Sequence, residues 1–412
     1  MEARVFEHAS AMPAPTWYFL HMNDATIEVA GNMAPARDIV VETDATLGDA
    51  TAAFVEAMQA AQSAWDAAYG DKPVLANAVD EQAEELGGLA LSAYQKKADA
   101  MEQAKSLAAS FEQGMGEEVS DWLRECAGAT QAIIAPARST STATVQIAGI
   151  DAGANVAALD LVAHEGATLD VAIVVDSPVA GTGLTGSSIR IFAAEGAHVT
   201  VRRVQTLDDS WTDLDDMGLF AADNATIDVH QTVLGAGKTY TGLAGDLRGY
   251  NSAINVYTHY LGHDDQELDF NYILRHHGAK STCNLYANGV LAGSSKKTLR
   301  GTIDLIRGGK GAVGHEVDNV LLVDEGVSNK TVPNILCNED DVMGNHGATI
   351  GHIKADQLFY LESRGLSPEQ AEQMFVTASL EDAWLNAANE VTKQAVARLG
   401  NTLVNDFEEV YL

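Results

Sequence analysis

The sequence predicts a mainly β protein whose core is a right-handed parallel β-helix, a solenoid of stacked β-coils, with helical domains at both ends. From about residue 143 to residue 355, helical periodicity is absent and short alternating apolar triplets follow Gly, Asn and Asp turns. These triplets recur at steps of 30, 28, 27 and 29 residues, measured from Leu169 through Val199, Ile227 and Ile254 to Cys283. Because a sustained period of this length is typical of a solenoid, we favour a β-helix over a β-sandwich of short strands.

Helical patterns on either side of this core set the predicted domains. Residues 1–140 are predicted to form a mixed, mainly helical N-terminal domain. An apolar stripe of helical spacing covers 54–69, and further helices fit 80–111 and 117–126. Residues 141–355 are predicted to form the β-helix core.

Residues 356–412 return to helical patterns and are predicted to form a C-terminal domain. Its first helix ends at Arg364-Gly365, because Gly readily takes the left-handed conformation that closes a helix. The run Ser367-Pro368-Glu369-Gln370 begins a second helix, with an N-cap serine, proline at the first helical position and a capping-box glutamine. A third helix is expected to begin at Ser379 and to end at Gly400.

The chain is strongly acidic. Its 412 residues include 25 Lys and Arg against 58 Asp and Glu, which gives a net charge of −33. A surface of this charge repels nucleic acid, anionic membranes and polyanionic substrates such as polyuronates. These classes of partner are therefore not expected.

The cysteines and the N-terminus indicate the cellular compartment in which the protein is expected. Cys126, Cys283 and Cys337 lie far apart and form neither a disulfide framework nor a CxxC zinc motif. Such cysteines fit a reducing environment. The chain also begins without the basic-then-apolar pattern of a signal peptide, and no apolar run approaches 18 residues. We expect a soluble, cytoplasmic protein.

The sequence lacks the common enzymatic motifs. It contains no GxxxxGK[ST], GxSxG or HExxH, and we interpret Gly308-Gly309-Lys310-Gly311 as a β-turn. A metal site built from His263-Asp264-Asp265 and His276-His277 is less favoured than a polar turn and a cross-strand pair. The basic doublets Arg202-Arg203 and Lys296-Lys297 are expected to be solvated or salt-bridged.

The segment 333–351 concentrates more chemistry than any other stretch. It holds a thiol, three carboxylates and an imidazole within ten residues, and Cys337, Glu339 and His346 are the candidate site residues. Thiolate, carboxylate and imidazole groups together can ligate iron or zinc. Cys337 and His346, nine residues apart, would face opposite ways on one strand. The intervening Asn-Glu-Asp-Asp turn resets the direction, so the spacing leaves a shared site open.

This segment resembles the C-terminal signature of the SufB/SufD family of iron–sulfur cluster assembly scaffolds. The matching strings are NHGATIG at 345–351, DQLFYLESRGL at 356–366, PAPTW at 13–17, GMGEE at 114–118 and KTLRG at 297–301. The resemblance spans the chain and is weakest over 50–110. SufB-type chains carry Glu-His-Glu-Ala at the signature, whereas this chain carries His346-Gly347-Ala348, as SufD-type chains do.

The resemblance implies a β-helix flanked by helices, a SufB-like paralogue as partner and two copies of the SufC ATPase. His346 would serve as the functional histidine, a transient iron ligand where a cluster is built at the interface with the paralogue. SufD chains commonly carry a cysteine two residues before this histidine, where this chain has Gly344. Cys337 is the nearby substitute. The resemblance does not settle whether a flavin takes part.

The same resemblance assigns the ATPase contact to the C-terminal helices, where the signature residues are Leu358, Phe359, Tyr360 and Arg364. It implies a non-catalytic scaffold subunit rather than an enzyme. Two alternatives stay open: a SufB-like scaffold that forms homodimers, and a β-helix enzyme acting on polysaccharides. The acidic charge and the lack of a secretion signal disfavour the second.

Overall fold

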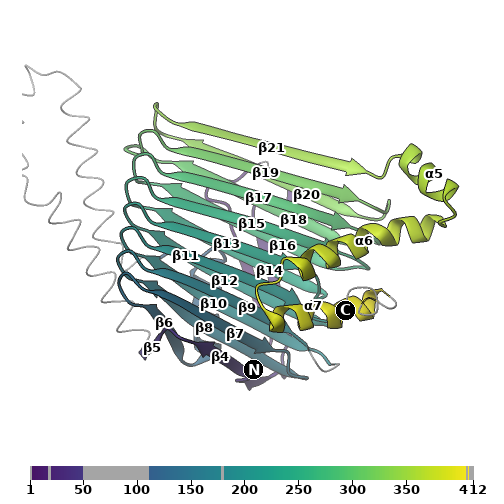
Figure 1. The fold of residues 1–412 in the computed structure, drawn as a ribbon, viewed down its shortest axis with the longest axis horizontal. Coiled ribbons are helices and arrows are strands. Elements are labelled where there is room, and N and C mark those ends of the chain that lie inside the picture. Colours follow the sequence, from purple (N-terminus) through teal and green to yellow (C-terminus); the bar gives the residue numbers. More distant parts are fainter. Residues whose placement is uncertain (1, 17–19, 50–110, 178–180, 405–406, 408–412) are drawn as a thin grey trace, which may run out of the picture.

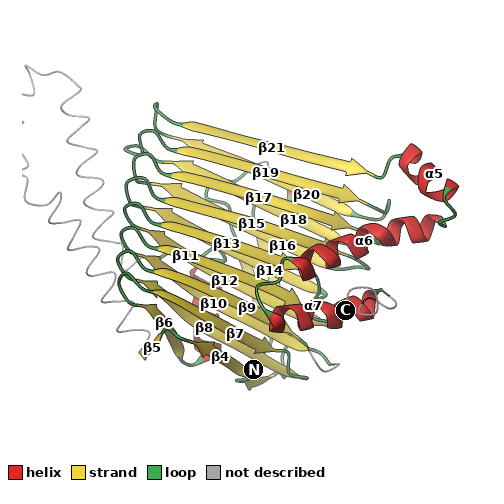
Figure 2. Ribbon diagram, viewed as in Figure 1, coloured by secondary structure: helices red, strands yellow, loops and turns green. Residues whose placement is uncertain are grey.

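The computed structural model describes residues 2–16, 20–49, 111–177, 181–404 and 407. In these residues the chain passes back and forth between two stacked sheets, so that each coil adds one strand to each sheet (Figures 1 and 2). Strands from β6 onward pair in parallel with the strand one coil away. The predicted mainly β fold with a parallel β-solenoid core is confirmed.

The two sheets take alternate strands of the chain. The odd-numbered sheet has the order β21 (Met343–His352), β19 (Val313–Leu322), β17 (Thr282–Leu291), β15 (Ala253–Gly262), β13 (Thr226–Val233), β11 (His198–Thr206), β9 (Thr168–Asp176), β7 (Thr140–Ala148) and β4 (Ile39–Thr43). The even-numbered sheet has the order β20 (Ser328–Cys337), β18 (Lys296–Leu305), β16 (Glu267–His276), β14 (Lys238–Leu247), β12 (Trp211–Ala221), β10 (Gly183–Ala193), β8 (Gly153–Ala163), β6 (Thr130–Ala135) and β5 (Thr46–Asp49). Strand β3 (Ala34–Ala36) also pairs with β8, and β4 and β5 join their sheets antiparallel.

The repeat found in the sequence is the register of the odd-numbered sheet. Leu169, Val199, Ile227, Ile254 and Cys283 are direct neighbours on successive strands. All five side chains are fully buried. Because parallel strands in register place equivalent residues on the same face, each apolar triplet stacks on the one below it.

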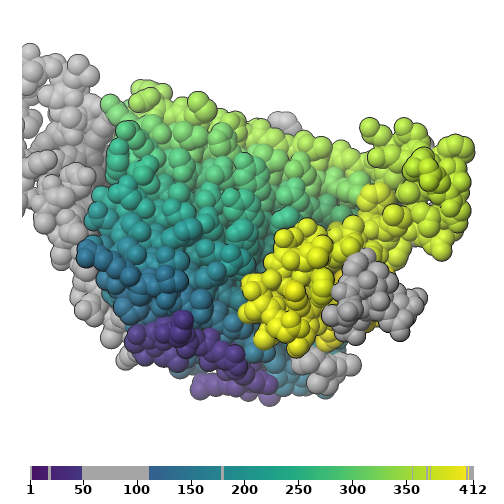
Figure 3. All heavy atoms as spheres, viewed as in Figure 1, coloured from purple at the N-terminus to yellow at the C-terminus, as the bar shows by residue number. Residues whose placement is uncertain are grey.

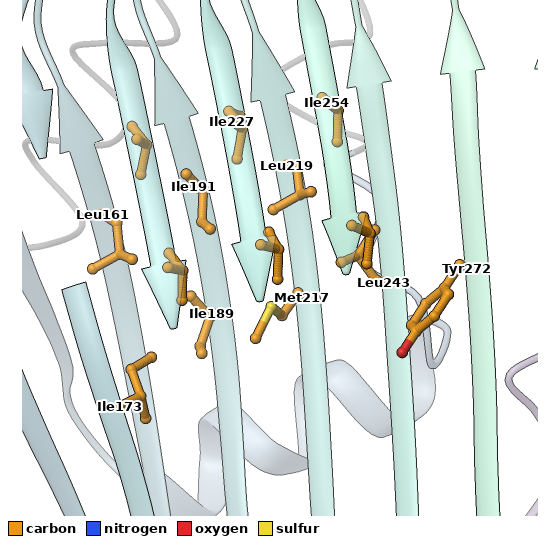
Figure 4. Close-up of a cluster of buried hydrophobic side chains, with 14 of the residues drawn as sticks. Leu161, Ile173, Ile189, Ile191, Met217, Leu219, Ile227, Leu243, Ile254 and Tyr272 are labelled. Atoms are coloured by element: carbon orange, nitrogen blue, oxygen red, sulfur yellow. The ribbon is translucent and has the colours of Figure 1, made fainter. Parts of the chain in front are cut away.

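The core lies between the two sheets. Figure 4 shows Leu161, Ile191, Leu219 and Leu243 of the even-numbered strands meeting residues such as Ile227 of the odd-numbered strands. These aliphatic side chains are almost completely removed from water, and each contributes about 1.5–3 kcal/mol relative to an exposed position. The solenoid is thus stabilised by one continuous apolar column.

The helices cover the outer faces of the sheets. Helix α4 (Glu117–Ala127), as predicted for 117–126, packs with the hairpin of β1 (Arg4–Ala9) and β2 (Ala25–Val29) against β8 and β10. Helices α6 (Pro368–Leu385) and α7 (Glu390–Leu403) lie across the odd-numbered sheet (Figures 1 and 3). Leu380, Val396 and Leu399 are buried there against Val204 and Leu261.

Helix α5 (Ala355–Ser363) and the start of α6 match the sequence signals. Gly365 follows α5 with a φ of 93°, and Ser367 and Gln370 form the expected capping box at the start of α6. The expectation of a new helix at Ser379 is wrong. Its hydroxyl donates a hydrogen bond to the Phe375 carbonyl (3.2 Å), so Ser379 is satisfied inside α6 and caps nothing.

The expected helix end at Gly400 is also wrong. Asn389 caps α7, whose last residue is Leu403, so Gly400 lies within the helix. A Cβ on Gly400 would approach a Phe407 ring carbon to 2.5 Å. The glycine therefore permits close packing of Phe407 rather than a stop.

The predicted N-terminal helices over 54–69 and most of 80–111 lie outside the described residues. Within the described part of 1–140 the chain forms β1 to β6 and α4, and the two domain boundaries stay predictions. Among the helices that the structure describes, none is long and apolar enough to cross a membrane.

Arg398 is expected to hold α7 on the solenoid. Its guanidinium donates to Asp176 Oδ1 (2.6 Å) and Asp208 Oδ1 (3.0 Å) in the turns below it. We predict that Arg398→Ala increases amide hydrogen exchange across 390–403 while the exchange of β13 and β15 is unchanged, because the solenoid core does not depend on this contact. Hydrogen-exchange mass spectrometry measures both.

The matched control is Arg138→Ala, which breaks the exposed pair with Glu165 and should leave stability and exchange nearly unchanged, because solvent screens exposed ion pairs. Equal exchange across α7 in wild type and Arg398→Ala would show that apolar packing alone holds the helix.

Candidate functional site at the open end of the solenoid

The solenoid ends at two strands that have a neighbour on one side only. β20 pairs with β18, β21 pairs with β19, and among the described strands none continues either sheet beyond them. Nearly every residue of β21 is exposed, and Figure 1 shows this strand at the edge of the stack. Free backbone N–H and C=O groups on such edges are a template for pairing with another chain. This end is called the open end below.

His346 lies on β21, directly beside Glu316 of β19. Glu316 is buried inside the solenoid at 2% exposure. Residues paired in a parallel sheet share a face, so the exposed His346 occupies the continuation of this interior position at the open end. The imidazole is therefore placed at the mouth of the core rather than on the outer surface of the sheet.

Cys337 also occupies an interior position, but it is separated from His346. It is the last residue of β20 and pairs with the buried Leu305. Glu316 reaches across the interior to Gly301, whose neighbour on β20 is Pro333. His346 thus faces the level of Pro333, about 13 Å along the strand from Cys337. The turn between β20 and β21 does not bring the thiol and the imidazole together.

Glu339 is a turn residue in the structure. Its carboxylate accepts hydrogen bonds from the backbone N–H groups of Gly308 (2.8 Å) and Asp340 (3.1 Å), and it is 6% exposed. These bonds join the last turn to the turn one coil below. The position of Glu339 is accounted for by backbone capping.

Three ionisable side chains, Lys297, Asp318 and Glu316, lie inside the solenoid just below the open end. Lys297 donates to Asp318 Oδ2 (2.5 Å) and to the Thr331 hydroxyl (3.1 Å), and Thr331 donates to the same carboxylate oxygen (2.6 Å). The Tyr260 hydroxyl donates to Asp318 Oδ1 at 3.3 Å. Burial lowers the pKa of Lys297, and the Asp318 carboxylate opposes that shift. Lys297 and Asp318 therefore neutralise each other and are satisfied by hydrogen bonds inside the solenoid.

Glu316, the third group, is not bonded in this way. Neither carboxyl oxygen has a hydrogen-bond partner among the residues that the structure describes. Burial, reinforced by the nearby Asp318, raises the pKa of Glu316 to about 8. The side chain is therefore mostly protonated and neutral at pH 7, which avoids the cost of an unpaired buried charge.

The signature residues of α5 form a projecting surface. Phe359 is 70% exposed and Tyr360 is 55% exposed, whereas Leu358 is half-buried. The Arg364 guanidinium lies 4.9 Å from the centre of the Tyr360 ring. Helix α5 contacts α6 and extends beyond the sheets (Figures 1 and 3). Exposed aromatic rings stacked with an arginine are typical of protein-binding surfaces.

A comparison with known families places this architecture. The family described as "SUF system FeS cluster assembly, SufBD core domain" matches residues 146–379, more than half of the chain. The chain belongs to this family. The match covers the solenoid from β7 onward, the open end and the first two C-terminal helices, so the resemblance found in the sequence is confirmed.

Curated relatives show that this SufBD chain is SufD-like. It is 27% identical over 186 residues to the iron–sulfur cluster assembly protein SufD of Escherichia coli, covering 45% of this chain and 44% of that protein. It is 25% identical over 187 residues to SufD of Bacillus subtilis, covering 45% and 43%. A chloroplastic SufBD-family protein of Arabidopsis thaliana is 23% identical over 243 residues, covering 56% and 43%. The matched regions therefore span less than half the length of these relatives.

The other histidine cluster of this SufBD chain is a polar turn, as favoured from the sequence. Asp209, His263 and Asp264 bring potential ligand atoms within 4.8 Å of one another. However, His263 Nδ1 bonds to Asp264 Oδ2 (2.8 Å), and its Nε2 lies 3.1 Å from the Gln266 amide nitrogen. Both ring nitrogens are engaged by neighbouring side chains, which satisfies this buried imidazole.

The remaining candidates also have structural partners. His276 bonds to Ser281 (2.7 Å) and Cys283 (3.1 Å) in the core, and burial lowers its pKa to about 4. His277 instead bonds to Asp246 at 2.7 Å. The basic doublets are salt-bridged as expected, through the pairs Arg202–Asp170, Arg203–Asp213, Lys296–Glu267 and Lys297–Asp318. Arg203 and Lys297 are buried, which the doublet pattern did not indicate.

A cavity of about 900 Å³ lies between α6 and the outer face of the odd-numbered sheet. It is lined by His230 and Tyr257, whose rings stack with centres 4.8 Å apart, and by His259, whose Nδ1 is 4.0 Å from Asp382 Oδ2. These side chains point away from the solenoid interior. The cavity therefore lies on the outer face of the sheet, where it extends to Thr349 and Gly351 of β21, whereas His346 occupies an interior position.

Glu316 should make stability depend on pH. Its pKa of about 8 in the folded chain is above its ordinary value of 4.5, so the folded state holds a proton that the unfolded state has lost between these values. Its contribution to stability is complete below about pH 4.5 and is lost as the pH rises towards 8. We predict that Glu316→Gln gains stability relative to wild type over this window, on the order of a few kcal/mol.

Chemical denaturation at a series of pH values measures this difference. The control Glu195→Gln changes an exposed turn carboxylate and should run parallel to wild type. Parallel curves for wild type and Glu316→Gln would contradict the raised pKa.

Proposed function

We propose that this chain is the SufD-like scaffold subunit of a SUF-type complex that assembles iron–sulfur clusters, and that it pairs there with a SufB-like paralogue and a SufC-type ATPase. The main support for the proposal is the position of His346 at the open end of the solenoid. It lies on β21, an edge strand that pairs with a neighbour on one side only. The SufBD match and the curated SufD relatives support the process. The subunit is non-catalytic and acts in the cytoplasm.

The paralogue is assigned to the open end. Strands β20 and β21 each offer a row of backbone donors and acceptors, and a second solenoid of similar width can continue both sheets at once. Such pairing would bury His346 between the two chains. A site formed in this way is completed only in the complex, which suits a cluster that is built and then handed on.

The cluster is cargo, and the residues of this chain act on it from one side. The His346 imidazole offers a nitrogen ligand that holds iron less tightly than a thiolate, so that release remains possible. Cys337 and Glu339 are kept as secondary candidates only: the thiol lies along the strand from His346, and the carboxylate is used by backbone amides. Thiolates of the partner would supply the remaining ligands.

The ATPase is assigned to the C-terminal helices. Leu358, Phe359 and Tyr360 lie on α5, and Arg364 follows directly as its C-cap. Helix α5 contacts α6, which is packed on the outer face of the odd-numbered sheet. A motion imposed on α5 by ATP-driven dimerisation can therefore be passed through α6 to the strands that carry the open end. This is the proposed link between ATP hydrolysis and access to the cluster.

Coexpression with a SufB-like paralogue and a SufC-type ATPase tests the assignment. A single heteromeric complex in gel filtration, together with cluster formation under anaerobic reconstitution, is expected. A stable homodimer that excludes the paralogue would instead support the homodimeric SufB-like scaffold.

His346→Ala is predicted to leave folding and complex formation intact and to reduce cluster assembly at least about tenfold, because the substitution removes a ligand from an exposed strand without touching the core. Iron, sulfide and visible absorption are compared after anaerobic reconstitution of the complex. The control is His315→Ala, the neighbouring residue that faces outward on β19. Normal assembly by His346→Ala would remove the histidine from the mechanism.

Phe359→Ala combined with Tyr360→Ala is predicted to weaken binding of the ATPase at least about tenfold, because both exposed rings would be buried in that contact. Binding of the paralogue should be unchanged, since α5 is not part of the open end. Met374→Ala, an exposed apolar residue on α6, is the control. Calorimetric titration measures the affinity, and an unchanged value would move the ATPase contact away from α5.

A further inference from the structure

Glu316 is the one buried carboxylate at the open end whose bonding the described residues leave unexplained. Asp318, two residues away on the same strand, is bonded to Lys297, Thr331 and Tyr260. Glu316 is equally buried, yet both of its carboxyl oxygens are unpartnered among the described residues. Burying a carboxyl group without hydrogen-bond partners is unfavourable, so packing alone gives no reason for an acid at this position.

Space has been left around this carboxyl group. A Cβ on Gly301, across the interior, would lie only 2.2 Å from Glu316 Oε1, so any larger residue there would displace the carboxyl group. A cavity of about 10 Å³ adjoins it, lined by Gly301, Tyr272 and Leu299, which is room for about one water-sized group. The absence of a side chain at Gly301 is therefore what makes room for the Glu316 carboxyl group inside the packed core.

The position beside Glu316 on the edge strand belongs to His346. The two residues are direct neighbours in the register of β19 and β21, so their Cβ atoms are about 5 Å apart on the same face. An ion about 2 Å from each ligand atom fits between side chains at this spacing. On β21 the adjoining interior positions are occupied by Gly344 and Ala348, which leave the approach from outside unobstructed.

We propose that Glu316 is a second protein ligand, beside His346, for the ferrous ion handled at the open end of the solenoid. This inference rests on the proposed function, because it assigns a further residue to the same site. The carboxyl group swings from Gly301 towards β21, releases its proton to solvent as the ion binds and contributes one oxygen, while the imidazole contributes one nitrogen. A mixed oxygen and nitrogen donor set suits Fe²⁺.

The arrangement also explains why the ion would be cargo. Two protein ligands leave most coordination positions to water or to groups of the partner chain, so the ion is held and remains transferable. Asp318 cannot take this role without breaking its bonds to Lys297 and Thr331. Glu316 rather than Asp318 is therefore the available ligand, because Asp318 is already held by hydrogen bonds and Glu316 is not.

The test is anaerobic calorimetric titration of the full chain with Fe²⁺, and with Co²⁺ as a spectroscopic probe. Glu316→Gln and His346→Ala should each weaken binding at least about tenfold, and the double variant should be no weaker than the weaker single variant, because one ion needs both ligands. The Co²⁺ absorption bands should change in both single variants. Glu195→Gln, an exposed carboxylate in a distant turn, should bind as wild type does.

Three outcomes would overturn the inference. Wild-type affinity in Glu316→Gln would show that the carboxylate is not a ligand. Equal weakening in Glu195→Gln would assign the binding to surface charge, and additive losses in the double variant would place the two residues at separate ions. None of these results bears on assembly with the paralogue and the ATPase, which coexpression tests, so failure of the inference and failure of the proposed function are distinguishable.

Discussion

The structure depends on the in-register stacking of parallel strands. Backbone hydrogen bonds between neighbouring coils keep each residue beside its equivalent one coil away, as in the pairing of Val199 with Leu169 and Ile227. Because the side-chain period of a strand is two, a slip of one residue would move the whole apolar column to the outside. The alternation of inward apolar and outward polar residues is what prevents that slip. The positions of the helices and of the open end follow from this register.

The same stacking explains why function collects at one end. A coil in the middle of the solenoid has neighbours on both sides, so its interior positions are closed to solvent, whether they hold aliphatic side chains such as Leu219 or the buried pair Arg203–Asp213. The last coil has no neighbour above it among the described strands, and its interior positions reach solvent at His346. Glu316, one coil below, differs from that buried ion pair because its carboxyl oxygens have no partner among the described residues. The open end thus combines free backbone edges with functional side chains.

Local signals in the sequence were reliable where they act within one or two turns of chain. The capping box at Ser367 and the helix end at Gly365 were predicted because their hydrogen bonds and backbone angles involve adjacent residues. Ser379 and Gly400 were misinterpreted for the complementary reason. A serine inside a helix looks like a cap until its bond to the preceding turn is seen, and a glycine looks like a stop until its contact with Phe407 is seen. The decisive contacts were tertiary or lay in the preceding turn.

The sequence by itself determined the solenoid and the family, because a period of about 28 residues and the signature around His346 can both be recognised from the order of the residues alone. Tertiary structure alone decided that Cys337 lies about 13 Å from the level of His346. It also decided that Glu316 stands beside His346, although 30 residues separate them. Aligning Glu316 with Leu285 in the repeat would have revealed an acid at an interior position. Whether its oxygens have hydrogen-bond partners depends on side chains from the opposite sheet, and those contacts exist only after the coils have stacked.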